Sequence, residues 1–273
     1  MVTVPSQYLH PLPTAEDLPD SDETPVDNEL QNDIPNMLLD LLREIWGSSS
    51  EDASRRSDWF WGVDMGIYYE ANREEPAKSK CIVPDGFLAL GVPKNVGEGG
   101  RLSYVLWEEK EKPILVFEVV SKKYNGEYDS KLAKYEELGI LYCVIYNSTT
   151  GRKLYKNHQS LEVYKLIDGK YQLMPSVSLL REGGKMVWIP EIALGIGCEQ
   201  GDHGDWQREW VYWYDRFGKR YPTAYERAAM AEAIAAQSDL AKQRAEAIAI
   251  QEKQKNEKLM SYLKSIGINP DDL

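Results

Sequence analysis

Two carboxylates stand in apolar stretches of the sequence, where an acidic side chain is unusual. Glu118 lies within the β-branched run 114–120, and Asp85 interrupts the apolar run 81–90. Such runs are typical of strands buried on both faces, where an ionised carboxylate is costly unless it is paired or binds a cation. Two carboxylates on neighbouring strands suit Mg²⁺, which prefers oxygen ligands and keeps water molecules for chemistry. The alternative is that each acid marks a bulge, an edge or a turn.

The stretch 113–147 contains the elements that would hold the second of these acids in place. We expect a strand over 114–120, a helix over 129–138 that Gly139 ends, and a second strand over 140–146. Strand, helix and strand in this order, within about 35 residues, form the βαβ unit of a mixed α/β sheet.

Several short motifs follow one another along the chain. They are Pro84-Asp85, Glu118-Val119-Val120-Ser121, Asp129-Ser130-Lys131, Tyr135, Gly139, Tyr142, Met186 to Glu191, Trp213-Tyr214-Asp215 and Ile266 to Pro270. In this order they resemble the putative restriction endonuclease family that is expanded in cyanobacteria, which belongs to the PD-(D/E)XK nuclease-like superfamily. The resemblance covers most of the chain beyond about residue 30, and spaced motifs in the right order are more specific than any one of them.

The resemblance implies a restriction endonuclease-like α/β (α+β) fold, with a mixed sheet flanked by helices, and an endonuclease that hydrolyses DNA. It implies that Asp85 and Glu118 bind Mg²⁺ or Mn²⁺ while a lysine positions or activates the attacking water. The superfamily pattern places this lysine two residues after the second acid, where the chain has Val120. Lys131, on the next helix, matches the position that the family uses instead. Lys122 is the other candidate, because alternation puts it on the face of Glu118 if the strand extends that far.

Three polar residues near the proposed site have alternative roles. Lys131 is an ordinary solvated helix lysine if the family pattern does not apply. Ser121 either orients a ligand or, more in keeping with its propensity, caps the following loop. In many nucleases of this superfamily an acid of the first helix joins the metal site, so Glu44 is a candidate third acid, with a surface role as the alternative.

Length and composition favour one globular domain with tails. Residues 1–33 are rich in Pro, Asp and Glu, which predicts a mostly disordered acidic tail. Residues 34–221 are expected to form the restriction endonuclease-like domain, with an amphipathic helix over 34–46 and a first strand over 59–70. Residues 222–273 are expected to form a C-terminal helix.

The formal net charge of -12 opposes DNA binding, because duplex affinity depends on Lys and Arg that neutralise phosphates. The first 33 residues hold eight acids and no Lys or Arg, so the rest of the chain carries a net charge of -4. Six basic residues also gather near the proposed site, where they form either a phosphate-binding groove or a solvated face. These residues are Lys78, Lys80, Lys122, Lys123, Lys131 and Lys134.

Other residue types indicate no further chemistry. The three cysteines are scattered, so we expect neither a disulfide framework nor zinc, and the three histidines match no catalytic or metal spacing. The aromatic group over 188–214 is expected to be core, with stacking on unpaired bases as the alternative. No apolar run approaches the ~20 residues that span a bilayer, and no signal-peptide pattern is seen, which predicts a cytoplasmic protein without membrane contact.

Residues 223–266 are good helix formers with no Gly or Pro among them. Ile234, Ala241 and Ile248 recur every seven residues, although the pattern breaks at Lys255. We expect a coiled coil that pairs two copies of the chain and so supplies the two nuclease sites that double-strand cleavage needs. The alternative is a single solvent-exposed helix of marginal stability.

By analogy to the family that it resembles, the chain is expected to be an enzyme, a Mg²⁺-dependent DNA endonuclease that acts as a homodimer. Asp85 and Glu118 would hold the ion, and Lys131 would assist. Two other classes of protein fit the same residues. One is a nuclease fold that binds nucleic acid without cutting it, and the other is an oligomeric scaffold that acts through its C-terminal helix.

Overall fold

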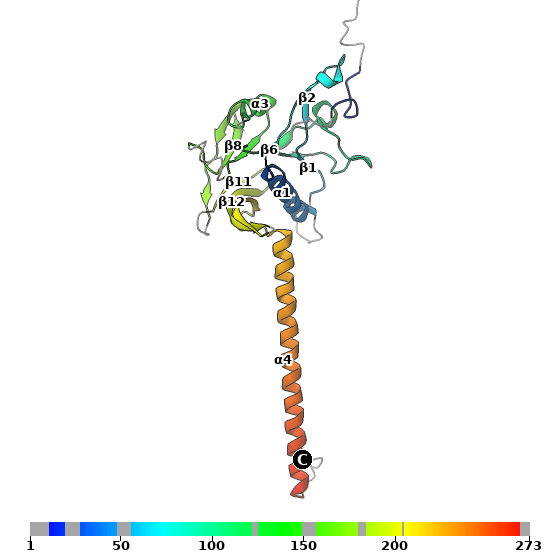
Figure 1. The fold of residues 1–273 in the computed structure, drawn as a ribbon, viewed down its shortest axis with the longest axis vertical. Helices are drawn as coiled ribbons and strands as arrows, with labels where there is room; N and C mark the ends of the chain where they lie inside the picture. Colours follow the sequence, from blue (N-terminus) through cyan, green and yellow to red (C-terminus); the bar gives the residue numbers. More distant parts are fainter. Residues whose placement is uncertain are drawn as a thin grey trace, which may run out of the picture. The chain divides into compact units, whose positions relative to one another are not determined.

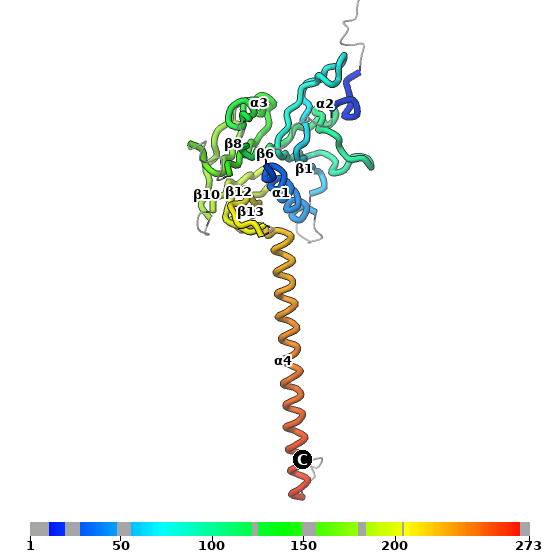
Figure 2. Tube along the Cα trace, viewed as in Figure 1, coloured from blue at the N-terminus to red at the C-terminus, as the bar shows by residue number. Residues whose placement is uncertain are grey.

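The computed structural model describes most of the chain and divides it into two compact units, Met1–Tyr221 and Pro222–Leu273 (Figure 1). The residues described are 11–19, 28–47, 56–121, 125–148, 157–179, 184–203 and 205–267. Figure 2 follows the same path along the Cα trace.

Among the described residues of the first unit, a six-stranded central sheet has the strand order β1-β4-β6-β7-β8-β9. Strands β6 and β7 pair in parallel, and the other neighbours are antiparallel. The strands are β1 Trp59–Val63, β4 Gly86–Leu90, β6 Pro113–Val119, β7 Tyr142–Tyr146, β8 Leu161–Ile167 and β9 Lys170–Leu173. A parallel pair needs a crossover connection, and helix α3 (Ser130–Leu138) provides it. The predicted βαβ unit is confirmed.

Helix α3 begins and ends where the local chemistry predicts. Asp129 is its N-cap, and the Asp129 side chain accepts a hydrogen bond from Ser130 N. Gly139 ends the helix with a φ of 73°, a left-handed conformation that glycine adopts at little steric cost. These two residues fix the length of the helix that crosses from β6 to β7.

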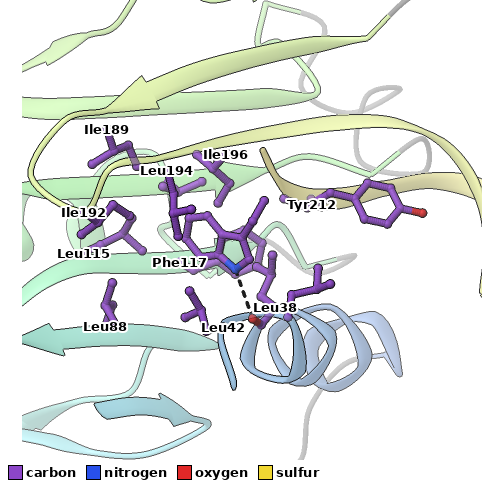
Figure 3. Packing of buried hydrophobic residues seen from close by; sticks show 14 of the residues in the cluster. Leu38, Leu42, Leu88, Leu115, Phe117, Ile189, Ile192, Leu194, Ile196 and Tyr212 are labelled. Carbon is purple, nitrogen blue, oxygen red and sulfur yellow. Dashed lines mark hydrogen bonds between the residues drawn. The ribbon is translucent and has the colours of Figure 1, made fainter. Parts of the chain in front are cut away.

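Helix α1 (Leu30–Gly47) and a second sheet cover one face of the central sheet. The second sheet consists of β10 Val177–Ser178, β11 Lys185–Ile189, β12 Leu194–His203 and β13 Trp206–Tyr214, all antiparallel. Figure 3 shows Leu38 of α1, Phe117 of β6 and Ile196 of β12 converging in one core. Trp213 Nε1 donates to Leu38 O at 3.1 Å, so the core prediction holds for this buried tryptophan, whereas Trp206 is 38% exposed.

Helix α3 covers the opposite face of the central sheet. Its Tyr135 is fully buried and packs with Val116 of β6 and Cys143 of β7. A third sheet, in the order β3-β2-β5, adds Ile67 and Tyr104 to this core. Its strands are β2 Ile67–Glu70, β3 Lys80–Ile82 and β5 Tyr104–Val105, with the short helices η2 (Pro76–Lys78) and α2 (Leu106–Glu109) beside them in sequence.

Three element predictions are wrong in their bounds. The strand expected over 81–90 is β3 and β4, which belong to different sheets, so Asp85 lies between two strands and not within one. The strand expected over 59–70 is two strands in different sheets, because the backbone of Asp64 has a φ of 48° and interrupts the extended chain. The first helix starts at Leu30 rather than at Ile34, so it takes in the last residues of the predicted tail.

Part of the predicted acidic tail has defined contacts. Leu18 is buried, Tyr68 Oη donates to Pro19 O at 2.7 Å, and Trp107 Nε1 donates to Pro13 O at 2.8 Å. Residues 1–10 and 20–27 lie outside the described residues.

The second unit contains helix α4 (Ala224–Ser265), whose 42 residues correspond to about 63 Å. Thr223 and Glu226 form a capping box, in which Glu226 N donates to Thr223 Oγ1 and Thr223 N donates to Glu226 Oε2. Among the residues that the structure describes, no helix combines the length and the apolar character needed to cross a bilayer.

Candidate active site

The antiparallel pairing of β4 with β6 brings the two predicted acids together. Gly86 pairs with Phe117, so one further step along the same register sets Asp85 opposite Glu118. Asp85 is 7% exposed and Glu118 is 1% exposed. Asp85 Oδ2 also accepts a hydrogen bond from Val119 N at 2.6 Å, which holds this carboxylate against the end of β6.

The residues around Asp85 explain why the chain turns here. Pro84 has no N–H to continue the ladder of β3, and the chain passes from the third sheet into the central sheet at this point. A Cβ on Gly86 would lie 2.9 Å from Trp61 Cζ2 and 3.3 Å from Pro35 Cβ. Glycine at this position therefore lets helix α1 approach the strand that carries Asp85.

Lys131 reaches from α3 to the second acid. Its Nζ donates to Glu118 Oε2 at 2.8 Å, to Glu118 Oε1 at 3.1 Å and to Val83 O at 3.1 Å. The side chain of Lys131 is 17% exposed, so the pair lies just below the surface. The structure thus brings three predicted site residues, Asp85, Glu118 and Lys131, into one centre, whereas Lys122 lies outside the described residues.

Tyr135 is a site residue whose role the sequence analysis missed. Its hydroxyl donates to Glu118 Oε1 from a fully buried position. Tyr135 lies four residues after Lys131, which puts both side chains on one face of α3. This spacing is the signal that the sequence carries, although an aromatic residue at such a position also fits a purely structural role.

Helix α1 contributes an amide to the site. Gln31 Nε2 lies 3.2 Å from Asp85 Oδ1 and 3.3 Å from Ser121 Oγ, and Gln31 is 9% exposed. Glu44, the candidate third acid on the same helix, is exposed. The first helix therefore contacts the centre through Gln31. The sequence analysis missed this residue because it considered only acidic residues of the first helix.

A buried acid holds the loop that leads from β6 toward α3. Glu127 Oε1 accepts from Ser121 N and Glu127 Oε2 accepts from Asn125 N, each at 3.1 Å. Ser121 was expected either to orient a ligand or to cap this loop. Its backbone is held by Glu127, and its hydroxyl faces Gln31, close to Asp85.

Burial dominates the electrostatics of the centre. It raises the pKa of Asp85 well above the usual range, and the neighbouring charge of Glu118 adds to this shift. Burial also raises the pKa of Glu118, although hydrogen bonds from Lys131 and Tyr135 oppose it. For Lys131, burial alone would lower the pKa, but the charges of Glu118 and Asp85 outweigh burial and raise it. The lysine is therefore a cation at neutral pH.

The donor set suits a hard divalent cation of the Mg²⁺ type. Among the described residues, no group of three or more His, Cys, Asp or Glu side chains is placed to hold a metal ion. Two carboxylates are nevertheless enough for Mg²⁺ when water and substrate phosphates complete its shell. Asp85 and Glu118 each have oxygen lone pairs beyond those that accept the hydrogen bonds described above, because a carboxylate offers about four acceptor sites.

The basic residues that were expected near the site are mostly paired with acids. Lys78 contacts Glu75, Lys80 contacts Glu70, and Lys134 contacts Glu137, each pair partly or largely exposed. Lys122 and Lys123 lie outside the described residues. Of the six lysines, those that the structure describes therefore give little support to a phosphate-binding groove.

The mixed sheet is flanked by helices, with Asp85 just before β4, Glu118 on the neighbouring strand β6 and Lys131 on helix α3. This arrangement is that of the restriction endonuclease-like class of proteins. The sequence model of the Uma2 family, described as Putative restriction endonuclease, matches residues 22–198. This match spans more than half of the chain, so the chain belongs to that family. No curated protein and no solved structure matches the chain significantly.

Proposed function

We propose that the chain is an endonuclease that hydrolyses phosphodiester bonds of DNA and depends on Mg²⁺ or Mn²⁺. One observation carries the proposal, the convergence of Asp85, Glu118 and Lys131 in a buried centre at the end of β6. Burying two acids is unfavourable, as their raised pKa values indicate, and a bound cation would favour their ionised forms. Membership of the Uma2 family, described as Putative restriction endonuclease, supports the same class of reaction.

Asp85 and Glu118 would hold the ion through their carboxylate oxygens. A bound Mg²⁺ supplies a water molecule of lowered pKa and offsets negative charge on the phosphate. Val119 N orients Asp85, while Tyr135 Oη and Lys131 Nζ orient Glu118, so both carboxylates are positioned before any ligand arrives.

Lys131 would act as a donor of hydrogen bonds and positive charge. Its raised pKa keeps Nζ protonated, so it cannot accept a proton from water at neutral pH. A protonated amine beside the carboxylates can orient the attacking water and stabilise charge that develops on the phosphate. In this way Lys131 would replace the lysine that the superfamily pattern expects at the position of Val120.

We further propose that α4 pairs two copies of the chain. The side chains of its described residues are not buried, and Ile234, Ile248 and Tyr262 are 57% to 68% exposed at intervals that are multiples of seven. Helices of globular proteins gain most of their stability when an apolar face packs against other elements. Within the second unit, no described element packs against the apolar residues of α4. A second copy would cover this face and bring two nuclease centres into one assembly.

Titration calorimetry of Mg²⁺ and Mn²⁺ tests the metal site, beside assays of DNA cleavage. We expect the parent protein to bind the ion and to cut DNA, and Asp85→Ala and Glu118→Ala to lose both activities. Glu44→Ala is the matched control, because Glu44 is an exposed acid on α1, and it should behave as the parent does.

Near-ultraviolet circular dichroism should show that each variant keeps its fold. If the parent bound neither ion, with or without DNA, the nuclease proposal would be wrong. If both alanine variants were folded and still cut DNA, these two acids would not be the metal site.

A further inference from the structure

A second cluster of polar side chains surrounds Glu162 of β8. Glu162 is 4% exposed, and its Oε2 lies 3.0 Å from His158 Nδ1. Tyr164 Oη donates to the same oxygen at 2.6 Å, and Gln159 N donates to Oε1 at 3.0 Å. A carboxylate on Nδ1 makes that nitrogen the donor and leaves Nε2 of the imidazole for another partner.

The imidazole of His158 has a second contact that fixes its orientation. The ring of Tyr128 stacks on it, with ring centroids 3.7 Å apart and an interplanar angle of 18°. The side chain of His158 is 32% exposed, and its Nε2 has no hydrogen-bond partner among the residues that the structure describes. One face of the ring is therefore covered, and one polar atom of this partly exposed side chain is left for a further partner.

This cluster lies beside the carboxylate centre. Glu118 of β6 pairs with Ile145 of β7, and Ile145 pairs with Glu162 of β8, so the two acids are two strands apart on the sheet. At the usual strand spacing this separation is about 10 Å. Tyr128 also lies only three residues before Lys131, which binds Glu118.

Asn147 supplies a further polar group at the same edge of the sheet. It follows the last residue of β7, and its N–H continues the ladder to Ser160 O at 2.8 Å. Asn147 is fully buried, and neither Oδ1 nor Nδ2 has a hydrogen-bond partner among the residues that the structure describes. Strand alternation puts its side chain on the sheet face of Ile145 and Glu162. An unpaired buried amide is costly, so a ligand that accepts its N–H would remove a penalty.

We propose that His158 and Asn147 form a subsite for a backbone phosphate of the DNA strand, next to the centre that cuts it. The inference rests on the proposed nuclease function. A DNA strand rises about 3.4 Å per nucleotide along the helix axis and also winds around it, so neighbouring phosphates lie farther apart than this rise. A separation of about 10 Å therefore corresponds to a phosphate about one to two nucleotides from the cleaved bond. A cationic imidazole donates from Nδ1 to Glu162 and from Nε2 to a phosphate oxygen, and Asn147 Nδ2–H can donate to the same phosphate. Tyr128 already occupies one face of the imidazole, which favours a hydrogen-bonded phosphate over a stacked base.

Fluorescence anisotropy of a labelled DNA duplex tests the subsite, with Ca²⁺ in place of Mg²⁺ to limit cleavage. We expect His158→Ala in the full chain to weaken binding about tenfold, as the loss of a charge-assisted hydrogen bond does. His158→Gln retains an N–H donor close to the position of Nε2 and should recover part of the affinity. Gln159→Ala is the matched control, because only the backbone of this exposed residue contacts Glu162.

A second measurement locates the phosphate. In a duplex with a determined cleavage position, neutral methylphosphonates are placed one at a time along the strand that is cut. One substitution, about one to two nucleotides from the cleaved bond, should weaken binding of the parent but not of His158→Ala.

Three outcomes separate the inference from the function on which it rests. If the parent neither binds nor cuts DNA, both proposals are wrong. If it binds and cuts while folded His158→Ala binds equally well, only the subsite is wrong. If His158→Ala and His158→Gln weaken binding equally and no methylphosphonate position distinguishes His158→Ala from the parent, His158 has a structural role and the subsite is also wrong.

Discussion

The site illustrates how a lysine can serve a carboxylate from a different element. Val120, at the position where the superfamily pattern expects lysine, is 3% exposed and belongs to the core beneath α3. A lysine buried there would lose hydration in an apolar environment. Lys131 instead approaches from α3, where its stem is largely buried and Nζ reaches both oxygens of Glu118. The charge is thus retained although the residue that carries it lies elsewhere in the sequence.

The first prediction concerns this lysine. Lys131→Ala should lower the rate of DNA cleavage by about 10²-fold or more, because a positioned donor beside the reacting groups is lost. DNA affinity should change little, since Lys131 would act mainly on charge that develops in the transition state and less on the bound DNA. Quenched-flow cleavage and anisotropy binding measure the two quantities separately.

Lys134→Ala is the control for Lys131→Ala. Lys134 lies on the same helix but pairs with the exposed Glu137, so its removal should leave cleavage unchanged. Removing Lys131 also leaves Glu118 buried with fewer partners, at a cost of about 3 kcal/mol in unfolding free energy. Cleavage at the parent rate by folded Lys131→Ala would show that Lys131 only balances the charge of Glu118.

Three helices serve the molecule in different ways at the scale of elements. Helix α3 carries Lys131 and Tyr135 to Glu118, and α1 brings Gln31 to Asp85 while its apolar face fills the core with β12 and β13. Helix α4 has no buried residues among those described. Its length and its exposed apolar residues therefore need an explanation outside the centre, and pairing with a second copy provides one.

The second prediction follows for α4. Deletion of residues 222–273 should convert a dimer into a monomer, because the apolar residues that recur on α4 are removed with it. The remaining residues form the other compact unit and should keep their circular dichroism spectrum and their metal binding. Light scattering coupled to size-exclusion chromatography measures the mass of each form.

Ile234→Asp with Ile248→Asp in the full chain is a gentler test than deletion. Both residues are exposed, so the substitutions should leave the helix intact while placing charge in the paired face. A full chain that is already a monomer at working concentrations would contradict the pairing, and so would a dimer that persists in the doubly substituted chain.

At the scale of the whole molecule, the folding stability depends on the protonation of the two buried acids. Asp85 and Glu118 both have raised pKa values, chiefly through burial, so the metal-free fold prefers them protonated. For Asp85 the folded state then binds the proton more tightly than the unfolded chain does. This contribution to stability is complete below the ordinary pKa of 3.8 and is lost as the pH rises through the folded pKa.

The third prediction follows from this loss of stability as the pH rises. At neutral pH, metal-free Asp85→Asn should be more stable than the parent by about 1 kcal/mol, since asparagine occupies the site without ionising. The gain should vanish at about pH 3, where Asp85 is protonated. Addition of Mg²⁺ should stabilise the parent and not the variant.

Denaturant unfolding of both proteins at several pH values measures the difference, and Glu118 contributes to both curves. A variant that is less stable than the parent at neutral pH without metal would contradict the prediction. So would a gain in stability that does not depend on pH.

The sequence by itself determined the central βαβ unit and pointed to three residues of the candidate site. Asp129 and Gly139 set the ends of α3, apolar runs set β6 and β7, and the cost of burying an acid singled out Asp85 and Glu118. Lys131 followed from the family resemblance. These signals are local, because caps, turns and apolar runs act through residues that are close in sequence.

Only the tertiary structure decided which distant residues complete the site. The chain breaks at Asp64 because the strands on either side of it, β1 and β2, belong to different sheets. Gln31 reaches Asp85 only because α1 packs closely over Gly86. His158 matched no motif, and its orientation comes from a stacked tyrosine on another loop. Such contacts depend on how sheets and helices pack across long stretches of chain, and the pattern of residues around each position does not contain that information.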